Sequence, residues 1–370
     1  MKSRLFAPIT LRELELANRI VVSPMCQYQA VNGAAQDWHL MNLGQYAMGA
    51  AGLVFAEATH VAPEARITHR CLGLWSDETE AALARVVNFC REHGVTALAV
   101  QLAHAGRKAS CDPPLSGGKP LGQERGAWTT LAPSPIPYDE GWHVPTALDR
   151  SGMARVKQQF VQAAKRAARL GFDVAEVHAA HGYLLSEFLS PLSNQREDAY
   201  GGSRENRMRL LLEIFEAVRA VWPKAHPLGV RISASEWVEA GWDIADSVAL
   251  AHELKAAGCD FLDVSSGGNH PKQAISLGPG YQVPFAERIK TETGITTMAV
   301  GMITEPRQAE DIIASGKADM VALARGMMFD PRWAWHAAEE LGADTAYARQ
   351  YARCHPSGRP QVFPVRQVAS

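Results

Sequence analysis

Two histidines and a tyrosine near the middle of the chain carry the clearest chemical signal in the sequence. They lie in the segment HAAHGY, where His178 and His181 are followed closely by Tyr183. Two imidazole N–H groups that converge on one carbonyl or nitro oxygen can stabilise the negative charge that develops on it. The reference pKa of tyrosine is about 10, so Tyr183 keeps its proton at neutral pH and can act as a general acid toward a carbanion-like carbon.

The histidine pair also permits two other interpretations. A metal-dependent hydrolase on a TIM barrel would use His178 and His181 as ligands. The sequence lacks the glutamate of H-E-x-x-H, however, and shows no obvious third ligand, so we predict no bound metal. The remaining alternative is structural, with both rings satisfied by local hydrogen bonds.

Eight short apolar runs predict the strands that position these residues. The runs show little alternation between apolar and polar residues, which is typical of strands covered on both faces in a parallel sheet. They are RIVVSP (19–24), GLVFAEA (52–58), VTALAVQL (95–102), FDVAEVH (172–178), PLGVRIS (227–233), DFLDVSS (260–266), ITTMAV (295–300) and DMVALA (319–324).

Amphipathic helices are predicted between most of these strands. Strands and helices that alternate in this number predict an α/β fold of the (β/α)8 TIM-barrel type. The competing doubly wound sheet is disfavoured because no G-x-G-x-x-G follows the first strand. Several helices end at a glycine that we expect in the left-handed conformation, namely Gly94, Gly171, Gly258 and Gly316. The helical periodicity covers residues 79–93, 152–170, 204–221, 245–257 and 306–315.

Three segments exceed what a barrel needs. Residues 5–18 predict an N-terminal hairpin that plugs the bottom of the barrel. Residues 106–148 follow the third strand and predict a long capping loop over the mouth, because a loop of this length is uncommon unless it is functional. Residues 354–370 show no periodicity. We therefore predict one barrel domain over residues 1–353 and an irregular C-terminal tail over 354–370.

The ends of the last two strands suit a phosphate group. In TIM barrels the loops after strands 7 and 8 commonly bind phosphate through backbone N–H groups. Gly301 follows strand 7, and Ala324 and Arg325 follow strand 8, where the arginine can add a charge-assisted hydrogen bond. Alternatively, Arg325 forms an ion pair on the rim with Asp330 or Glu305.

Arg231 and Cys26 also permit two interpretations each. Arg231 lies in the fifth strand, where it would either stabilise negative charge on a ring system or form a structural salt bridge. Cys26 follows Pro24 and Met25 at the end of the first strand, and the residues alone favour a buried, unreactive thiol there.

The composition excludes several classes of function. Lys and Arg total 37 and Asp and Glu total 39, so the net charge is −2 and no basic surface for nucleic acid is expected. The six cysteines include no C-x-x-C pair, which argues against a zinc or iron–sulfur site and fits a reducing compartment. No run approaches the roughly 20 apolar residues of a membrane span. We therefore expect a cytoplasmic protein without nucleic-acid or membrane partners.

Five segments of the chain stand out when they are taken together. They are SPMCQY (23–28), EATHVAPEARIT (57–68), QLAHAGRKAS (101–110), EVHAAHGYLLSEFLSPLSNQREDAYGGSRENRMRLLLE (176–213) and ALARGMMFDPRW (322–333). In combination they resemble the old yellow enzyme family of flavin-dependent ene-reductases, and above all its thermophilic-like subclass, which includes bacterial xenobiotic reductases. The resemblance runs from about residue 5 to residue 353. It implies a TIM barrel that binds FMN non-covalently and takes hydride from NADPH (or NADH).

For the cofactor, the resemblance implies four features. They are a wall around the flavin ring, a partner for its pyrimidine edge, a cation near its N1 and O2 atoms, and phosphate-binding loops. The wall cysteine of this subclass tunes the redox potential of the flavin, which changes the interpretation of Cys26. The matching residues are, in that order, Pro24, Met25, Cys26 and Ala58; Gln101; Arg231; and Gly301, Ala324 and Arg325.

For the substrate, the resemblance implies an electron-poor alkene, which is an α,β-unsaturated carbonyl or nitro compound. His178 and His181 match the pair that binds its oxygen, and Tyr183 matches the donor that protonates its α-carbon. Tyr28 matches a tyrosine that contacts the substrate. Hydride reaches the β-carbon from the reduced flavin, and the nicotinamide and the alkene use one site in turn. A non-catalytic flavoprotein is the remaining alternative.

Two further positions bear on assembly and substrate range. Residues 350–353 resemble a Tyr-x-Arg segment whose arginine reaches into a neighbouring subunit's active site. This implies a homodimer or homotetramer in which Arg353 binds substrate in the partner's site. Val300 stands where some xenobiotic reductases have tryptophan, so we expect a roomier pocket at that point.

Overall fold

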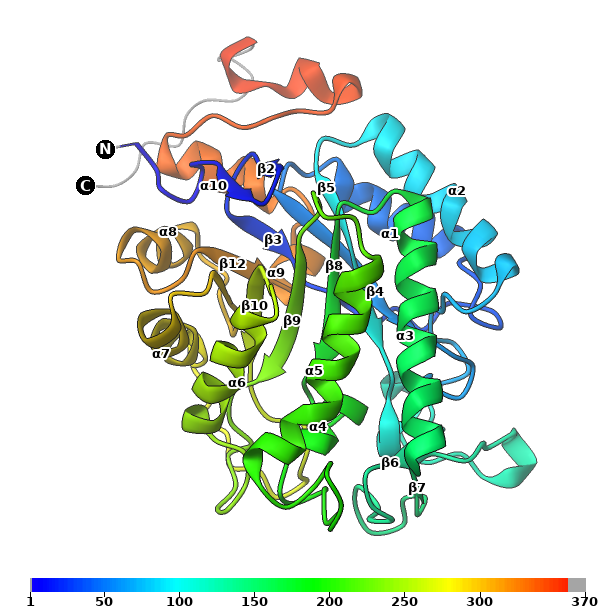
Figure 1. Cartoon of the computed structure of the whole chain (residues 1–370). Helices are drawn as coiled ribbons and strands as arrows, with labels where there is room; N and C mark the ends of the chain where they lie inside the picture. The colour runs from blue at the N-terminus through cyan, green and yellow to red at the C-terminus, as the bar shows by residue number, and fades with distance from the viewer. Residues whose placement is uncertain (1, 359–370) are drawn as a thin grey trace.

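The structure, a computed structural model that describes residues 2–358, contains a closed barrel of eight parallel strands (Figure 1). The order of the strands around the ring follows their order along the chain, as the predicted fold requires. Nearly all of their residues are buried, which explains the continuous apolar runs. The strands are β3 (Ile20–Val22), β4 (Leu53–His60), β5 (Ala97–Ala103), β8 (Val174–Ala179), β9 (Leu228–Ser233), β10 (Phe261–Ser265), β11 (Thr297–Ala299) and β12 (Met320–Leu323).

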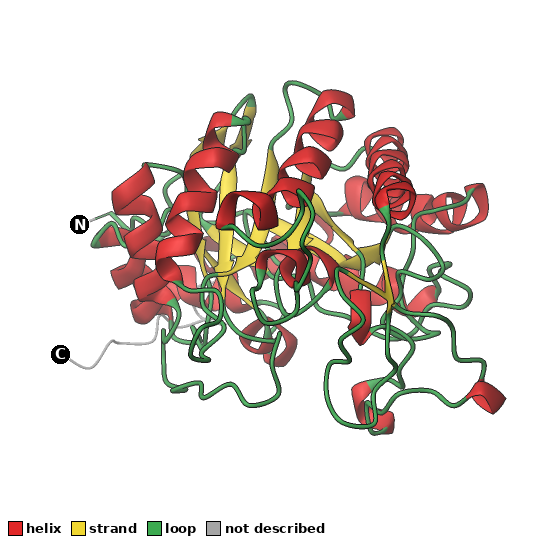
Figure 2. Ribbon diagram, turned by 60° about the horizontal axis from the view of Figure 1, so that its bottom comes forward, coloured by secondary structure: helices red, strands yellow, loops and turns green. Residues whose placement is uncertain are grey.

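Helices surround the strands (Figure 2). No helix within residues 2–358 is both long and apolar enough to cross a membrane. The five predicted helices are present as α2 (Asp77–His93), α3 (Arg150–Leu170), α5 (Arg204–Val221), α6 (Ile244–Ala256) and α8 (Pro306–Ala314). The helices outside the predicted segments are α1 (Asp37–Ala47), α7 (Val283–Thr293) and α10 (Trp333–Leu341), together with the short helices α4 (Leu184–Leu189) and α9 (Arg325–Phe329).

Side chains of each strand alternate between the inside and the outside of the barrel. On β8, Val174 belongs to the apolar cluster inside the barrel, whereas Val177 belongs to the core between the barrel and the helices. Glu176 and His178 share the face of Val174 and therefore point into the barrel. The interior thus changes from apolar to polar toward the mouth, which is the end where parallel strands of a TIM barrel place the active site.

The N-terminal hairpin closes the bottom of the barrel, as predicted. It consists of β1 (Ile9–Leu11) and β2 (Leu14–Leu16), which pair antiparallel. Leu11 and Leu16 pack against the apolar residues inside the barrel. Figure 1 shows the hairpin at the end of the barrel opposite to the mouth.

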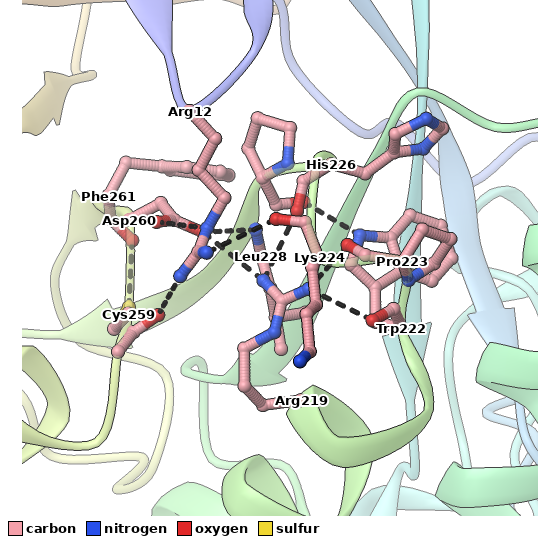
Figure 3. A network of polar contacts seen from close by, with 12 residues as sticks. Arg12, Arg219, Trp222, Pro223, Lys224, His226, Leu228, Cys259, Asp260 and Phe261 are labelled. Atoms are coloured by element: carbon pink, nitrogen blue, oxygen red, sulfur yellow. Dashed lines mark hydrogen bonds and ion pairs between the residues drawn. The ribbon is translucent and has the colours of Figure 1, made fainter.

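Arg12, at the turn of the hairpin, anchors it to the barrel (Figure 3). Its Nε atom donates to the carboxylate oxygens of Asp260 at 2.6 and 2.7 Å. The same carboxylate accepts hydrogen bonds from Arg219 at 3.3 Å and from the backbone N–H of Leu228 at 2.8 Å. Asp260 therefore joins the hairpin to α5 and to the start of β9.

We expect the Asp260→Asn variant to lose about 2 kcal/mol of unfolding free energy, because it removes the charge that two arginines share and keeps the side-chain volume. Such a loss corresponds to a fall in Tm of about 3 °C for a chain of this length, measured by thermal unfolding. Glu239→Gln is a suitable control, because Glu239 is exposed and makes no ion pair within the described residues. An unchanged Tm for Asp260→Asn would contradict the anchoring role.

Three of the four glycines that end predicted helices adopt the left-handed conformation. Gly171, Gly258 and Gly316 have φ values of 84°, 89° and 78°. Gly94 has a φ of −84°, so the prediction is wrong at this position. A Cβ atom on Gly94 would lie 2.9 Å from the Cβ of Ala47 at the end of α1. Glycine is therefore required here for the close approach of two helices rather than for the turn.

The predicted capping loop lies at the mouth of the barrel. Residues 106–148 contain three short 3-10 turns and the paired strands β6 (Leu131–Ala132) and β7 (Thr146–Ala147). Figure 1 shows this pair beyond the C-terminal ends of the barrel strands. The loop therefore covers the end of the barrel where the predicted site residues gather.

The C-terminal segment lies at the opposite end, beside the hairpin (Figure 1). A 3-10 helix, η4 (Arg349–Cys354), crosses the predicted boundary after residue 353, and η5 (Pro356–Gly358) follows it. Gln350 Nε2 is 3.3 Å from Nδ1 of His93, which ends the helix that leads into the bottom of β5. Most of the predicted tail, residues 359–370, lies outside the described residues.

Candidate active site

Four polar side chains form a layer inside the barrel, next to its apolar floor. Gln101 on β5 and Glu176 on β8 are partners in register, and Gln101 Nε2 donates to Glu176 Oε1 at 2.8 Å. Arg231 on β9 and Asp263 on β10 are also partners, with Arg231 Nε 3.1 Å from Asp263 Oδ2. None of the four is more than 9% exposed. These contacts fix an amide and a guanidinium inside the barrel.

The two acids of this layer are functional candidates that the sequence analysis missed. Burial raises the pKa of Glu176 well above its usual range, Asp263 raises it further, and Arg231 opposes the shift. Burial also raises the pKa of Asp263, again against the effect of Arg231. The sequence does contain a signal for Glu176, because it precedes His178 by two residues in a strand. Residues with this spacing lie on the same face of the strand, here the face inside the barrel.

His178 presents one free ring nitrogen at the mouth. Its Nδ1 accepts a hydrogen bond from the backbone N–H of Ala180 at 3.2 Å. Burial, followed by the effects of His181 and Arg231, holds the pKa of His178 well below its usual value, so the ring is neutral. A neutral ring whose Nδ1 accepts a hydrogen bond carries its proton on Nε2. Within residues 2–358 this Nε2–H has no partner, which makes it an available donor.

His181 lies beside His178 in a different backbone conformation. Its φ of 61° is left-handed, and the two rings meet edge to face with centroids 5.2 Å apart. Nε2 of His181 is 2.8 Å from Oγ of Ser265, which in turn lies 3.3 Å from Oε1 of Gln282. Burial lowers the pKa of His181 well below its usual value, so this ring is also neutral. Ser265 and Gln282 orient this ring and were not among the predicted site residues.

Tyr183 completes the group. Its ring meets that of His178 edge to face at 5.1 Å. Together with Tyr28 and Cys26 it packs against an apolar cluster that includes two tryptophans of the capping loop. Burial raises the pKa of Tyr183 well above its ordinary value, so the phenol is protonated at neutral pH. The structure thus brings together a protonated phenol and two neutral imidazoles.

The loop after β3 and the inner face of β4 lie beside this group. Burial, with a contribution from Glu57, raises the pKa of the Cys26 thiol well above its usual value, so the thiol is protonated. Ala58 is buried and in register with Gln101. Pro24 is half-buried, and Met25 packs its side chain against the core outside the barrel.

A pocket of about 380 Å³ opens between the barrel interior and the ends of β11 and β12. Arg231, Gly301, Ala324 and Arg325 line it, together with Val300. The terminal nitrogens of Arg231 have no partner in the described part of the chain, although the residue is only 9% exposed. Buried cationic donors without a partner suit a ligand with acceptor atoms or negative charge, and the flavin ring of FMN has acceptor atoms in both redox states and negative charge when it is reduced. The residues present therefore fit FMN.

The rim of this pocket contains the residues predicted to hold phosphate. Gly301 has a φ of 113°, and a Cβ atom there would lie 2.8 Å from Nε2 of Gln282. Arg325 is exposed, and within residues 2–358 it forms no ion pair with Asp330 or Glu305. The alternative structural interpretation of Arg325 is therefore not supported, and its guanidinium is available to a ligand.

Arg353 is the one predicted site residue that lies apart from the others. It is exposed on η4, at the hairpin end of the barrel, whereas the histidines and Tyr183 lie at the mouth. Arg353 therefore makes no contact with the site of its own chain.

Comparison with known proteins decides the family. The sequence model of the NADH:flavin oxidoreductase / NADH oxidase family matches residues 4–344. The chain belongs to this family. The resemblance to old yellow enzymes is thereby confirmed, and the protein is an oxidoreductase with FMN as its cofactor and a nicotinamide as its reductant. Membership of an oxidoreductase family also makes the metal-dependent hydrolase interpretation wrong.

Similar curated proteins come from Geobacillus and Bacillus species. A protein of Geobacillus sp. (strain WCH70), named NADPH dehydrogenase, is 44% identical over 95% of this chain and 99% of its own length. The NADPH dehydrogenase of Bacillus subtilis (strain 168) is 42% identical over the same shares of the two chains.

Several solved structures share the barrel. Morphinone reductase superimposes with a TM-score of 0.77 at 27% identity, over 93% of this chain and 91% of its own. A structure of morphinone reductase in complex with tetrahydroNAD gives a TM-score of 0.75 at 26% identity, over 93% and 92%. A 2-naphthoyl-CoA reductase shares the fold with a TM-score of 0.81 at 23% identity, over 91% of this chain and 52% of its own.

Proposed function

We propose that this protein is an ene-reductase, which uses NADPH (or NADH) to reduce the C=C bond of electron-poor alkenes that carry a carbonyl or nitro group. The observation that carries the proposal is the convergence of His178, His181 and Tyr183 beside a pocket that fits FMN. The names of the relatives, NADPH dehydrogenase and morphinone reductase, support the hydride donor and a small-molecule substrate.

The chemistry that FMN supplies when bound is hydride transfer, first from the nicotinamide to the cofactor and then from the cofactor to the β-carbon of the alkene. Gln101 and Arg231 would hold the flavin ring from inside the barrel, where the guanidinium stabilises negative charge. Gly301, Ala324 and Arg325 would hold the phosphate at the rim. The nicotinamide and the alkene would occupy the same place in turn.

His178 and His181 would bind the substrate oxygen. The free Nε2–H of His178 is one donor. Ser265 has one hydroxyl proton for two acceptors, Nε2 of His181 at 2.8 Å and Oε1 of Gln282 at 3.3 Å, and the latter already accepts from Ser266 at 2.6 Å. We assign this proton to the shorter contact, so that the proton of the neutral His181 ring lies on Nδ1, which becomes the second donor. Two N–H groups on one oxygen draw electron density from the C=C bond and stabilise the enolate-like charge.

Tyr183 would give its phenolic proton to the α-carbon while the β-carbon receives the hydride. The O–H bond of Tyr183 breaks as the C–H bond forms, and water later restores the proton. A phenol is suited to this role because burial keeps it protonated until an adjacent carbon carries negative charge. Tyr28 would contact the substrate from the neighbouring wall.

Flavin absorbance tests the function in two anaerobic steps. NADPH is expected to bleach the flavin, and 2-cyclohexenone is then expected to restore its absorbance with formation of cyclohexanone. Flavin that NADPH bleaches but neither 2-cyclohexenone nor a nitroalkene restores would overturn the ene-reductase proposal. Flavin that NADPH fails to bleach would point to the non-catalytic alternative.

We also infer a homodimer or homotetramer in which Arg353 completes the site of a partner subunit. Because Arg353 is exposed at the end opposite to its own mouth, it can serve a site only in a second copy. Exposed apolar side chains on α1 and α9, such as Trp38 and Phe329, are suited to contact between copies.

The Arg353→Ala variant is expected to bind cyclohexanone about tenfold more weakly, as loss of one charge-assisted hydrogen bond predicts, and to keep its flavin. Arg349→Ala, an exposed arginine of the same segment, is the matched control. At a low concentration of alkene, mixing Arg353→Ala with Tyr183→Phe chains should raise the rate of alkene reduction above that of Arg353→Ala alone, because a mixed dimer contains one site with both residues. A monomer in light scattering, with unchanged affinity in Arg353→Ala, would contradict the inference.

A further inference from the structure

Lys108 joins three loops at the mouth of the barrel. It ends η1 (Gly106–Lys108), the 3-10 turn that follows β5. Its ammonium donates to the backbone carbonyl of His181 at 2.7 Å and to that of Gly268 at 2.8 Å. The side chain therefore cross-links the loops that follow β5, β8 and β10.

The two carbonyls belong to segments that are tightly packed on each other. His181 has a left-handed φ of 61°, and a Cβ atom on Gly268 would lie 2.5 Å from the Cα of His181. A residue other than glycine is uncommon in this conformation and is held there by its surroundings. Lys108 is one of the groups that hold it, because it binds the carbonyl of His181 directly.

The charge of Lys108 also lies next to the proposed proton donor. Its Nζ is 5.1 Å from the centre of the Tyr183 ring and 4.8 Å from that of Tyr138, within the range of cation–π attraction. A cation attracts a phenolate more strongly than a phenol, because the phenolate carries a full negative charge. The ammonium therefore favours loss of the Tyr183 proton.

Neighbouring groups leave this charge largely uncompensated. Burial lowers the pKa of Lys108 to about 8, with Glu187 opposing the shift and Arg107 adding to it, so the ammonium is mostly charged at pH 7. Burial also raises the pKa of Glu187 to about 8, so this carboxyl is mostly protonated at pH 7. Cys111, whose pKa burial raises to about 11, is a neutral thiol.

We propose that Lys108 is a positioning residue with two separable roles. Its hydrogen bonds hold the backbone that presents His181, and its charge stabilises the phenolate that Tyr183 becomes after it protonates the substrate. The second role rests on the proposed ene-reductase function. In that step Tyr183 loses its O–H proton to the α-carbon, Lys108 keeps all of its protons, and water returns a proton to the phenolate.

Three replacements of Lys108 separate the two roles. Gln keeps N–H donors without the charge, Arg keeps both, and Met removes both while keeping the apolar stem. Binding of cyclohexanone, which is not reduced, reports on the positioning role and is measured by perturbation of the flavin absorbance. We expect Lys108→Met to weaken this binding about fivefold, and Lys108→Gln and Lys108→Arg to stay within about threefold of the wild type.

The alkene half-reaction reports on the charge. Lys108→Gln is expected to slow reoxidation by 2-cyclohexenone about 10- to 30-fold, whereas Lys108→Arg stays within about threefold. Reduction of the flavin by NADPH should hardly change. In a Tyr183→Phe background the Gln replacement should add little, because no phenolate forms there. Lys119→Gln, which changes an exposed lysine of the same capping loop, is the control.

Several results would overturn the two roles separately. Equal alkene rates for the wild type and Lys108→Gln would remove the charge role, as would a full effect of this replacement in the Tyr183→Phe background. An unchanged affinity for cyclohexanone in Lys108→Met would remove the positioning role. If no alkene reoxidised the reduced flavin of the wild-type protein, the proposed function would fail. The affinities for cyclohexanone would still test how Lys108 holds His181.

Discussion

Replacing Tyr183 with phenylalanine is expected to slow the alkene half-reaction about 10²- to 10⁴-fold and to leave reduction of the flavin by NADPH nearly unchanged. The reason is that hydride transfer to the flavin needs no proton from this phenol, whereas the α-carbon of the alkene does. The Tyr183 ring packs edge to face on His178, and phenylalanine keeps that contact. The two half-reactions are measured separately by stopped-flow absorbance under anaerobic conditions.

Tyr138→Phe is the matched control for this prediction. Tyr138 also lies at the mouth and its ring faces Lys108, but it has no proposed role as a donor. Its alkene half-reaction should stay within about threefold of the wild type, which is below the effect of a general acid. Equal losses in both half-reactions of Tyr183→Phe would reject the role of Tyr183 as proton donor, since they would indicate a disturbed flavin site.

Removal of one histidine of the pair is expected to have the second-largest effect. His178→Ala should slow the alkene half-reaction about 10²- to 10³-fold, because one of two donors to the developing oxyanion is lost. The same variant should bind cyclohexanone more weakly, because the free Nε2–H of His178 is a donor in the oxidised enzyme as well. Affinity and rate are both read from the flavin absorbance.

A conservative replacement at His181 distinguishes a donor from a packing role. His181→Ala should resemble His178→Ala, whereas His181→Asn keeps an N–H donor and should recover much of the rate. His252→Ala, at an exposed position on α6, is the control. If His181→Ala reduced the alkene as fast as His181→Asn, the nitrogen of His181 would not bind the substrate oxygen.

Most of the barrel was predictable because its strands are buried on both faces. Continuous apolar runs bounded by glycine or charge locate all eight strands, and the bounds of α5 agree with the periodicity. The helix α1 was not predicted because polar residues and a glycine interrupt the apolar pattern of its sequence. His39 is buried there with its Nε2 3.2 Å from the carboxylate of Glu57, and a Cβ atom on Gly44 would lie 2.8 Å from the ring of Phe89. Gly44 has a low helix propensity and His39 adds a polar residue to the buried face, and both make tertiary contacts that the sequence does not show.

The site was predictable where a residue acts through its own strand. Arg231 and His178 lie at the inner faces that strand alternation assigns to them. The contacts between loops were not predictable, because they join residues distant in sequence. Lys108 meets a carbonyl 160 positions away at Gly268. Ser265 meets His181 across 84 positions.

The position of η4 at the hairpin end restricts the symmetry of any assembly that shares Arg353. If two copies exchange this arginine reciprocally, the bottom of one barrel must lie beside the mouth of the other. A twofold axis parallel to the barrel axes would instead place bottom beside bottom. The axis must therefore run across the barrels, so that the two chains are antiparallel and both mouths are flanked by the partner's C-terminal segment.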